Sequence, residues 1–251
     1  MPAERRILII DTVHPVLPDR LSGYGFKCDI DTGKTYDYYS GIIENYYGVI
    51  LRSRITIDKA FIDAAKRLRF IGRVGSGLEN IDVTHAKTKG VKCFNSPEGN
   101  RNAVGEHALG LLLSLLNRLH IADRQVREGR WLREENRGRE IKNLSVGIIG
   151  YGNTGASFAG KLSGLGCRVL AYDKYKKGFG NSYVEEADYQ DIFSEVDVVS
   201  LHVPLTDETY YLVNNTFLAQ FHKPIVLINT SRGKVLDTGA LVCHLKQGSV
   251  L

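Results

Sequence analysis

Residues 144–173 constrain the fold of this chain most strongly, because a strand, a glycine-rich turn and a helix follow one another there. The apolar run LSVGII (144–149) leads directly into the turn. Three glycines follow with the spacing G-x-G-x-x-G: Gly150, Gly152 and Gly155. The next residues have the helical spacing of small and apolar side chains, and a second apolar run ends on Asp173. The segment predicts a β-α-β unit with parallel strands.

The glycine spacing in this position is typical of a loop that binds the pyrophosphate of a dinucleotide. Gly150 permits the tight turn, Gly152 lets the backbone approach the pyrophosphate, and Gly155 lets helix and strand pack closely. Asn153 and Thr154 begin the helix, whose N-terminal N–H groups would face the phosphates. The alternative is a plain β-α-β unit in which the glycines serve packing alone.

Asp173 follows the glycines by about 20 residues, which is the separation expected of an acid that binds the ribose of the dinucleotide. Its carboxylate can accept hydrogen bonds from both ribose hydroxyls, and it would repel a 2′-phosphate. This arrangement favours NAD over NADP. Lys174, Lys176 and Lys177 follow at once and weaken the preference, because their positive charge would attract a phosphate.

The whole chain alternates strand-like and helix-like segments, which predicts a layered α/β architecture with parallel sheets. The strand-like segments are 6–11, 48–53, 69–75, 91–100, 144–152, 167–173, 196–204 and 223–233. A long helix is expected over 102–129, and a boundary near residue 100 would divide the chain into domains 1–100 and 101–251. The first half of that helix is apolar around much of its circumference, so we expect it to be deeply buried or packed against another subunit.

Composition narrows the class of partner. The 251 residues carry a net charge of +5, and the basic residues are spread along the chain rather than gathered in a block. Small anionic ligands are therefore expected, and nucleic acid is not. The four cysteines lie far apart and form no metal-binding pattern, which predicts free thiols, no metal and a cytoplasmic location. No segment has the length of a membrane span, so no membrane partner is expected.

Seven segments, in matching order and spacing from about residue 48 to the last residue, resemble the D-isomer-specific 2-hydroxyacid dehydrogenases. They are LRSRITIDKAFIDAAKRL, FIGRVGSGLENID, NSPEGNRNAVGEHALGLLLSLLNR, VREGRW, the GYGNTG loop with its aspartate, DVVSLHVPLT and INTSRGKVLDTGAL. Within the family, they look most like its phosphoglycerate dehydrogenase branch. The resemblance implies a flavodoxin-like substrate domain, a Rossmann-type NAD-binding domain inserted in it, and a homodimer formed largely through the NAD domains. The helix 102–129 would supply part of that contact, unless it is an ordinary interior helix.

Two arginines end neighbouring strands at the edge where such sheets bind ligands, namely Arg52 and Arg73. Both match arginines that handle the phosphate in phosphoglycerate dehydrogenases, which implies 3-phosphoglycerate and 3-phosphohydroxypyruvate as the substrate pair. The alternative is two solvated surface arginines. The resemblance also assigns the substrate to Ser76 and Gly77, which would hold its carboxylate, and to Asn100. Without the resemblance, the GSG loop reads as a simple strand-to-helix turn.

Arg232 follows a strand at the same kind of edge, and the resemblance makes it the catalytic cation. It would hold the substrate carboxylate and stabilise the negative charge that builds on the reacting oxygen during hydride transfer. Five further residues would border the cofactor: His202, Val203, Pro204, Thr230 and Ser231.

Hydride transfer to a keto acid also needs a proton donor, which the family supplies as a histidine held by a glutamate. In the family both residues follow the position that corresponds to Leu251, and no histidine of this chain matches the catalytic one. We therefore expect the last Rossmann strands and the segment that returns to the substrate domain to be missing. Two hypotheses stay open: an NAD-dependent oxidoreductase of D-2-hydroxy acids that continues past Leu251, and a catalytically silent NAD-binding fragment or sensor.

Overall fold

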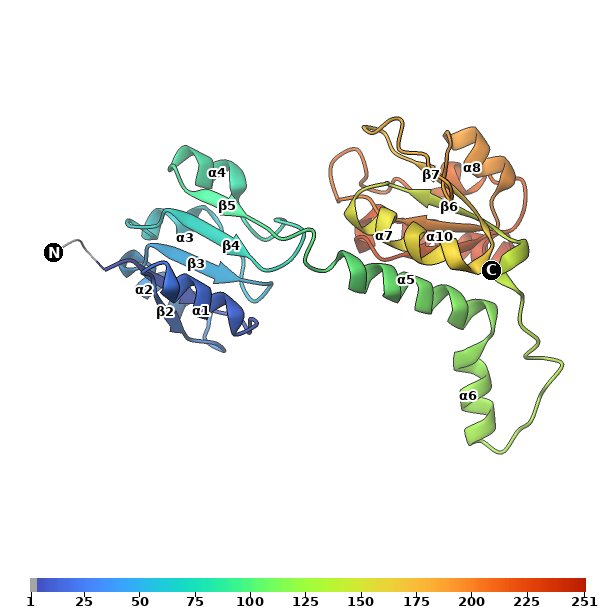
Figure 1. The fold of residues 1–251 in the computed structure, drawn as a ribbon, viewed down its shortest axis with the longest axis horizontal. Coiled ribbons are helices and arrows are strands. Elements are labelled where there is room, and N and C mark those ends of the chain that lie inside the picture. Colours follow the sequence, from blue (N-terminus) through green and yellow to red (C-terminus); the bar gives the residue numbers. More distant parts are fainter. Residues whose placement is uncertain (1–3) are drawn as a thin grey trace. The chain divides into compact units, whose positions relative to one another are not determined.

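The computed structural model describes residues 4–251, which divide into two compact units on either side of the bond between Asn100 and Arg101. Each unit contains one five-stranded sheet in which all paired strands are parallel (Figure 1). Each sheet is surrounded by helices of its own unit, as expected for α/β domains. In residues 4–251, no helix has both the length and the apolar character needed to cross a membrane.

The sheet of the first unit has the order β2-β1-β3-β4-β5, which is the flavodoxin-like order. Its strands are β1 (Arg6–Ile9), β2 (Lys27–Ile30), β3 (Gly48–Leu51), β4 (Phe70–Arg73) and β5 (Lys92–Phe94). Its helices are α1 (Val16–Gly23), α2 (Tyr36–Ile42), α3 (Lys59–Ala64) and α4 (Val83–Thr88), with a 3₁₀ turn at Ile43–Asn45. The expectation of a flavodoxin-like α/β fold is confirmed.

Alternating side chains of the central strands enter two cores on opposite faces of this sheet. Leu8 and Ile10 pack into the larger core with the apolar residues of α2 and α3, whereas Ile7 and Ile9 pack into the smaller one. Because both faces are covered, β1 and β3 are almost wholly apolar, as in buried parallel strands. Because β1, β3 and β4 run parallel, their carboxyl ends lie at one edge of this sheet.

The sheet of the second unit has the order β10-β9-β6-β7-β8, with the first strand of the unit at the centre. Its strands are β6 (Ser145–Ile149), β7 (Arg168–Tyr172), β8 (Glu185–Glu186), β9 (Val198–Leu201) and β10 (Val226–Asn229). β7 pairs with one side of β6 and β9 with the other, so the chain reverses direction across the sheet beside β6. This is the Rossmann arrangement, and its switch point is where ligands bind. Beyond β10, Val250 forms a further parallel bridge with Ile225.

The helices of the second unit are α5 (Arg101–Leu116), α6 (Leu119–Arg127), α7 (Asn153–Leu162), α8 (Tyr189–Glu195), α9 (Asn215–Leu218) and α10 (Thr238–Gln247). Three 3₁₀ turns lie at Ile141–Asn143, Ser163–Leu165 and Gly233–Val235. α5 packs closely on α7, since a Cβ at Gly105 would lie 2.7 Å from Ser157 Oγ.

The expectation of one helix over 102–129 is wrong, because the helix is broken between α5 and α6. Arg118 adopts a left-handed conformation with φ 52°. The returning loop supplies the physical reason: the Arg139 N–H donates to the Leu116 carbonyl at 3.0 Å, while the Asn117 side chain donates to the Leu113 carbonyl at 3.1 Å. A continuing helix would need the Leu116 carbonyl for its own next bond, whereas the Leu113 carbonyl still accepts its helical bond from the Asn117 N–H at 3.0 Å.

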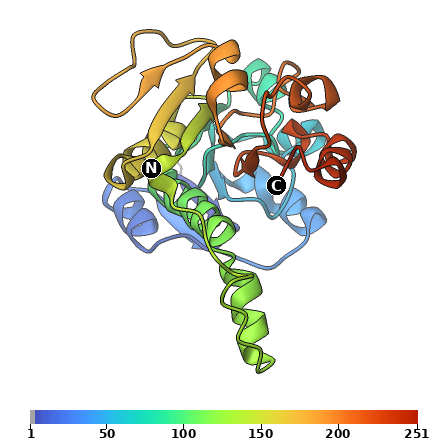
Figure 2. The ribbon, with the colours of Figure 1, turned by 90° about the vertical axis from the view of Figure 1, so that its right-hand side faces the viewer.

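Of the two alternatives expected for this segment, deep burial within the chain is contradicted for its second half, and packing against another subunit stays a prediction. α5 buries Gly105, Ala108, Leu112 and Leu116, whereas α6 buries none of its side chains. Figure 2 shows α6 and the loop after it extending away from the sheet of their own unit. The apolar side chains of this segment are thus partly exposed.

Candidate functional site

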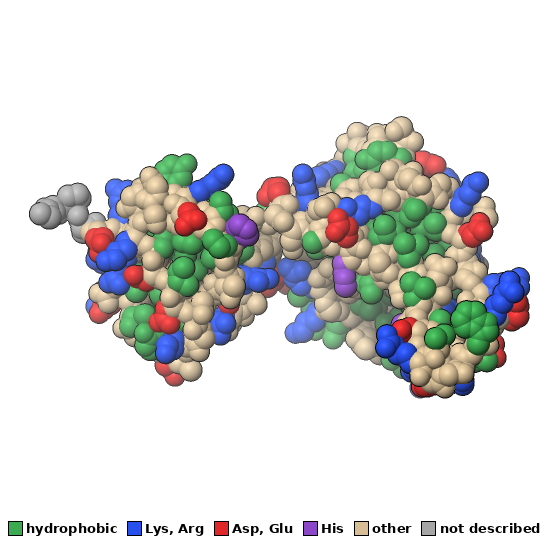
Figure 3. All heavy atoms as spheres, turned by 60° about the horizontal axis from the view of Figure 1, so that its bottom comes forward, with side chains coloured by type: hydrophobic (Ala, Val, Ile, Leu, Met, Phe, Trp, Pro, Cys, Tyr) green, Lys and Arg blue, Asp and Glu red, His purple; other side chains and the backbone are tan. Residues whose placement is uncertain are grey.

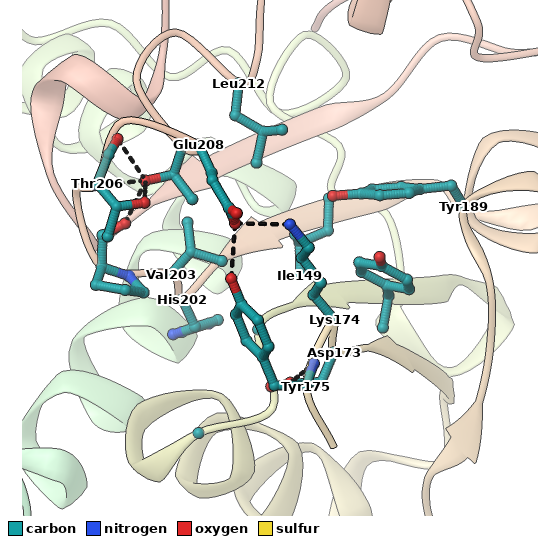
Figure 4. A pocket seen from close by; sticks show the side chains of 15 residues that line it. Ile149, Asp173, Lys174, Tyr175, Tyr189, His202, Val203, Thr206, Glu208 and Leu212 are labelled. Atoms are coloured by element: carbon teal, nitrogen blue, oxygen red, sulfur yellow. Dashed lines mark hydrogen bonds and ion pairs between the residues drawn. The ribbon is translucent and has the colours of Figure 1, made fainter. Parts of the chain in front are cut away.

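A cavity of about 390 Å³ lies at the carboxyl ends of β6, β7 and β9, at the switch point of the second unit (Figure 4). Six of the cofactor-binding residues expected from the sequence line it: Gly150, Gly152, Asp173, His202, Val203 and Pro204. Asn153, Thr154 and Gly155 lie next to it in the first turn of α7. The glycine loop, the acid and the β9 loop are thus brought together at one cavity.

The three glycines of the loop have different surroundings. Gly150 has a φ of 95°, and a Cβ there would lie 2.6 Å from the His202 carbonyl oxygen. A Cβ at Gly155 would collide with the Gly150 carbonyl oxygen. A Cβ at Gly152 would meet no described atom within 4 Å. Gly150 and Gly155 therefore allow the loop to fold, whereas Gly152 leaves open space beside the backbone.

The start of α7 borders this open space. Gly152 is the N-cap residue, and no side chain of the described residues caps the helix there. The first N–H groups of the helix therefore remain for an external acceptor, and the helix dipole favours a negative charge. An open approach and an uncapped ten-residue helix fit the pyrophosphate of a dinucleotide.

Asp173 shapes the loops around the cavity as well as facing it. Its carboxylate accepts backbone N–H bonds from Tyr151 at 2.8 Å, Tyr175 at 2.9 Å and Lys176 at 3.0 Å. An ionised carboxylate has about four acceptor positions. Asp173 therefore keeps about one acceptor position for a ribose hydroxyl in this arrangement, fewer than the two that the sequence suggested.

His202 is nearly buried, with 8% of its surface exposed, at the end of β9. Its Nε2 is 2.8 Å from Ser200 Oγ, and its buried Nδ1 has no partner among the described residues. Burial lowers the pKa of His202 to about 4, so the ring is neutral at physiological pH. His202 therefore contributes an uncharged, largely buried ring to the wall of the cavity.

The loop after β10 carries Thr230, Ser231 and Arg232, and Asn229 gives it its shape. The Asn229 Oδ1 accepts from Ser231 N at 3.0 Å and from Ser231 Oγ at 2.7 Å, and its Nδ2 donates to the Arg232 carbonyl at 3.0 Å. Arg232 Nη1 in turn donates to the Ser231 carbonyl at 2.9 Å. The Thr230 hydroxyl is buried without a partner among the described residues. Sequence reasoning missed Asn229, although an asparagine before Thr-Ser is a known turn former.

A separate hollow of about 270 Å³ lies at the carboxyl edge of the sheet in the first unit. Arg52 and Asn100 line it together with Gly75 and His14. The loop after β3 is fixed by Asp11, which accepts backbone N–H bonds from residues 52–54 at 2.6 to 3.3 Å. Sequence reasoning missed Asp11, whose place after the first strand was the available signal.

The other residues expected at this hollow serve the loops around it. Arg73 donates from Nε to the Arg52 carbonyl at 3.1 Å, and its guanidinium packs against Gly75. Ser76 donates from Oγ to Asn100 Oδ1 at 2.8 Å. Arg73, Ser76 and Gly77 are not among the residues that line the hollow.

Comparison with known proteins gives concordant matches. Residues 109–251, more than half of the chain, match the model of the D-isomer specific 2-hydroxyacid dehydrogenase NAD binding domain. D-3-phosphoglycerate dehydrogenase of Archaeoglobus fulgidus is 31% identical over 247 residues, covering 98% of this chain and 47% of that protein. Hydroxypyruvate reductase of Thermotoga maritima is 35% identical over 202 residues, covering 80% of this chain and 66% of that protein.

Among solved structures, the TT0316 protein of Thermus thermophilus superposes with a TM-score of 0.86 at 29% identity, covering 98% of this chain and 79% of that one. The chain spans about half the length of the phosphoglycerate dehydrogenases that it matches. The glycine loop and the acid after β7 lie within the residues that the family model matches. The chain therefore belongs to the D-isomer-specific 2-hydroxyacid dehydrogenase family, whose NAD-binding domain is matched by residues 109–251 of the second unit.

Proposed function

We propose that this protein transfers hydride between NAD and a D-2-hydroxy acid or its 2-keto acid, with 3-phosphoglycerate and 3-phosphohydroxypyruvate as the substrate pair in serine biosynthesis. The observation that carries the proposal is the switch-point cavity, where an open glycine, an uncapped helix and Asp173 surround one space. The phosphoglycerate dehydrogenase relatives support the choice of substrate.

In this proposal, the residues of the second unit bind and orient. The first N–H groups of α7 hold the pyrophosphate beside Gly152, and Asp173 accepts a bond from a ribose hydroxyl. NAD supplies the hydride chemistry when bound. Arg232 holds the substrate carboxylate and stabilises the charge that develops on the reacting oxygen. Thr230, with its unpartnered hydroxyl, borders the nicotinamide together with Ser231.

The hollow in the first unit supports an anionic substrate. Arg52 is exposed and lines that hollow, where its guanidinium can meet an anion. Arg73 is engaged with the Arg52 backbone, so Arg52 would be the main phosphate ligand rather than one of an equal pair. The Ser76–Asn100 bond would fix the loop, with Gly77, that receives the carboxylate.

The absorbance of NADH tests the reaction when the full-length protein is mixed with 3-phosphohydroxypyruvate or with hydroxypyruvate. We expect faster turnover with the phosphorylated acid. Arg52→Met should raise its KM about 10-fold or more, because a charge-assisted bond is lost, and should leave the KM for hydroxypyruvate unchanged. Arg20→Met, in α1, is the matched control.

Three outcomes separate the candidate functions. Turnover that favours hydroxypyruvate would assign the activity of the Thermotoga relative instead, since that substrate carries no phosphate. NADH binding without turnover of any 2-keto acid would support a silent NAD-binding module. Failure to bind NADH would contradict both.

We also propose that the protein is a cytoplasmic homodimer. The four cysteines are all free thiols, as expected in a reducing compartment. α6 has no buried side chain, and exposed apolar residues lie along this segment: Leu111, Leu115, Leu119, Val126 and Trp131. In Figure 3, hydrophobic side chains are exposed at the lower right, where this part of the second unit comes forward. Such a patch is typical of a surface that a second copy covers.

A further inference from the structure

Three lysines follow the acid that is expected to select NAD, and the structure shows what each of them contacts. Lys174 Nζ forms an ion pair with Glu208 at 2.7 Å. Lys176 Nζ donates to the Tyr151 carbonyl at 3.1 Å, and Lys177 Nζ lies 4.0 Å from Glu186. Of the three, only Lys174 lines the cavity. The preference of the cavity for one dinucleotide over another therefore depends on whether the Lys174 ammonium group can contact the ligand.

Glu208 belongs to the loop after β9, across the cavity mouth from the loop after β7. Its Oε2 accepts from Lys174 Nζ and, at 2.6 Å, from the Tyr175 hydroxyl (Figure 4). These bonds lower the pKa of Glu208, and the bond to Glu208 raises the pKa of Lys174. Both groups are charged at neutral pH, and the contact joins the two loops over the space beside Asp173.

Lys174 is the cation best placed to meet a phosphate on the ribose. It directly follows Asp173 and is about half exposed on a long, flexible side chain. An ion pair between the Lys174 ammonium group and a 2′-phosphate would offset the repulsion of that phosphate by Asp173. Asp173 already accepts three backbone bonds, so its capacity to select a free ribose hydroxyl is reduced. Asp173 alone is therefore a weak basis for discrimination.

We propose that Glu208 is a specificity-determining residue, which holds Lys174 away from the 2′-position of the cofactor ribose and so makes the cavity take NAD rather than NADP. The inference rests on the proposed function, because it assumes a dinucleotide in this cavity. Glu208 would disfavour a 2′-phosphate in two ways. It neutralises Lys174, the cation that would attract the phosphate, and its own negative charge repels the phosphate.

Binding of NADH and of NADPH to the full-length protein, measured by titration calorimetry without substrate, tests this. Glu208→Gln keeps the shape of the side chain and removes its charge. We expect this variant to bind NADPH about 10-fold more tightly than the wild type, while its affinity for NADH changes less than about twofold. The gain should shrink at high salt, because the groups are exposed.

Two further variants identify the cation. Glu208→Gln combined with Lys174→Met should lose the gain in NADPH affinity. Glu208→Gln combined with Lys177→Met should keep it, since Lys177 does not line the cavity. Equal gains in both double variants, an unchanged NADH-to-NADPH ratio in Glu208→Gln, or a wild type that prefers NADPH would each overturn the proposal.

The two proposals fail differently. A wild type that binds neither nucleotide contradicts the proposed function and this inference together. A wild type that binds NADH but reduces no 2-keto acid contradicts the proposed reaction only, because the selectivity test measures binding.

Discussion

Gly152 and Gly155 belong to one motif, but their surroundings assign them different tasks. We expect Gly155→Ala to lower the free energy of unfolding by about 2 kcal/mol or more, because the methyl group would collide with the Gly150 carbonyl. Gly152→Ala meets open space and should leave stability within about 0.5 kcal/mol. Its affinity for NADH should fall about 10-fold, because the methyl group takes the place of the pyrophosphate. Urea unfolding and NADH titration measure the two effects.

Gly160→Ala is the matched control for this pair. Gly160 lies inside α7, and a Cβ there would meet no atom within 4 Å. Alanine should raise the free energy of unfolding by about 0.5 to 1 kcal/mol and leave NADH binding unchanged. If Gly152→Ala bound NADH as tightly as Gly160→Ala does, the pyrophosphate would not lie beside Gly152.

His202 should make the stability of the protein depend on pH. Burial lowers its pKa to about 4 from the usual 6.5, so the unfolded chain takes up a proton in that window while the folded chain does not. The free energy of unfolding should therefore fall as the pH drops from 6.5 towards 4, by at most about 1.4 kcal/mol per pH unit from this group. Urea unfolding at a series of pH values measures the slope.

His202→Gln should flatten that slope, because glutamine does not titrate. His222→Gln, at an exposed position, should keep the wild-type slope. An equal slope in the wild type and in His202→Gln would show that other groups govern the acid sensitivity.

At the scale of elements, the break between α5 and α6 can be tested with glycine substitutions at two arginines, which should change the free energy of unfolding in opposite directions. Arg118→Gly should raise the free energy of unfolding by about 1 kcal/mol, because a left-handed conformation costs an L-residue that much. Arg124→Gly, inside α6, should lower it by about 1 kcal/mol, because glycine is a poor helix former. Thermal unfolding measures both. Destabilisation by Arg118→Gly would contradict the left-handed break.

The buried central strands were predictable from the sequence, whereas two exposed elements near the N-terminus were not. Apolar runs gave β3 and β6 because both are covered on two faces. β2 was missed because it is an edge strand without a buried residue, and α1 was missed because none of its side chains is buried. Neither has the periodicity that burial imposes.

At the scale of the whole molecule, the exposed apolar side chains of α6 make the proposed dimer testable. Val126 is 53% exposed, so Val126→Asp should not disturb the fold of the chain, but it would place a charge in the proposed interface. We expect this variant to sediment as a monomer and the wild type as a dimer. Leu245→Asp on α10, where the side chain is 46% exposed, is the control and should remain dimeric. A monomeric wild type would contradict the proposal.

The sequence by itself determined the α/β class, the glycine turn and the acid after β7, because these depend on local periodicity and on short, fixed spacings. It also indicated the family, through the resemblance of seven segments along the chain. Only the tertiary structure decided how the candidate sites are completed. Asp11 fixes the loop of Arg52, and Arg139 helps to end α5. Glu208 engages Lys174 from 34 residues away. No local pattern encodes such contacts, because each depends on how distant segments pack and on which polar groups that packing leaves to be satisfied.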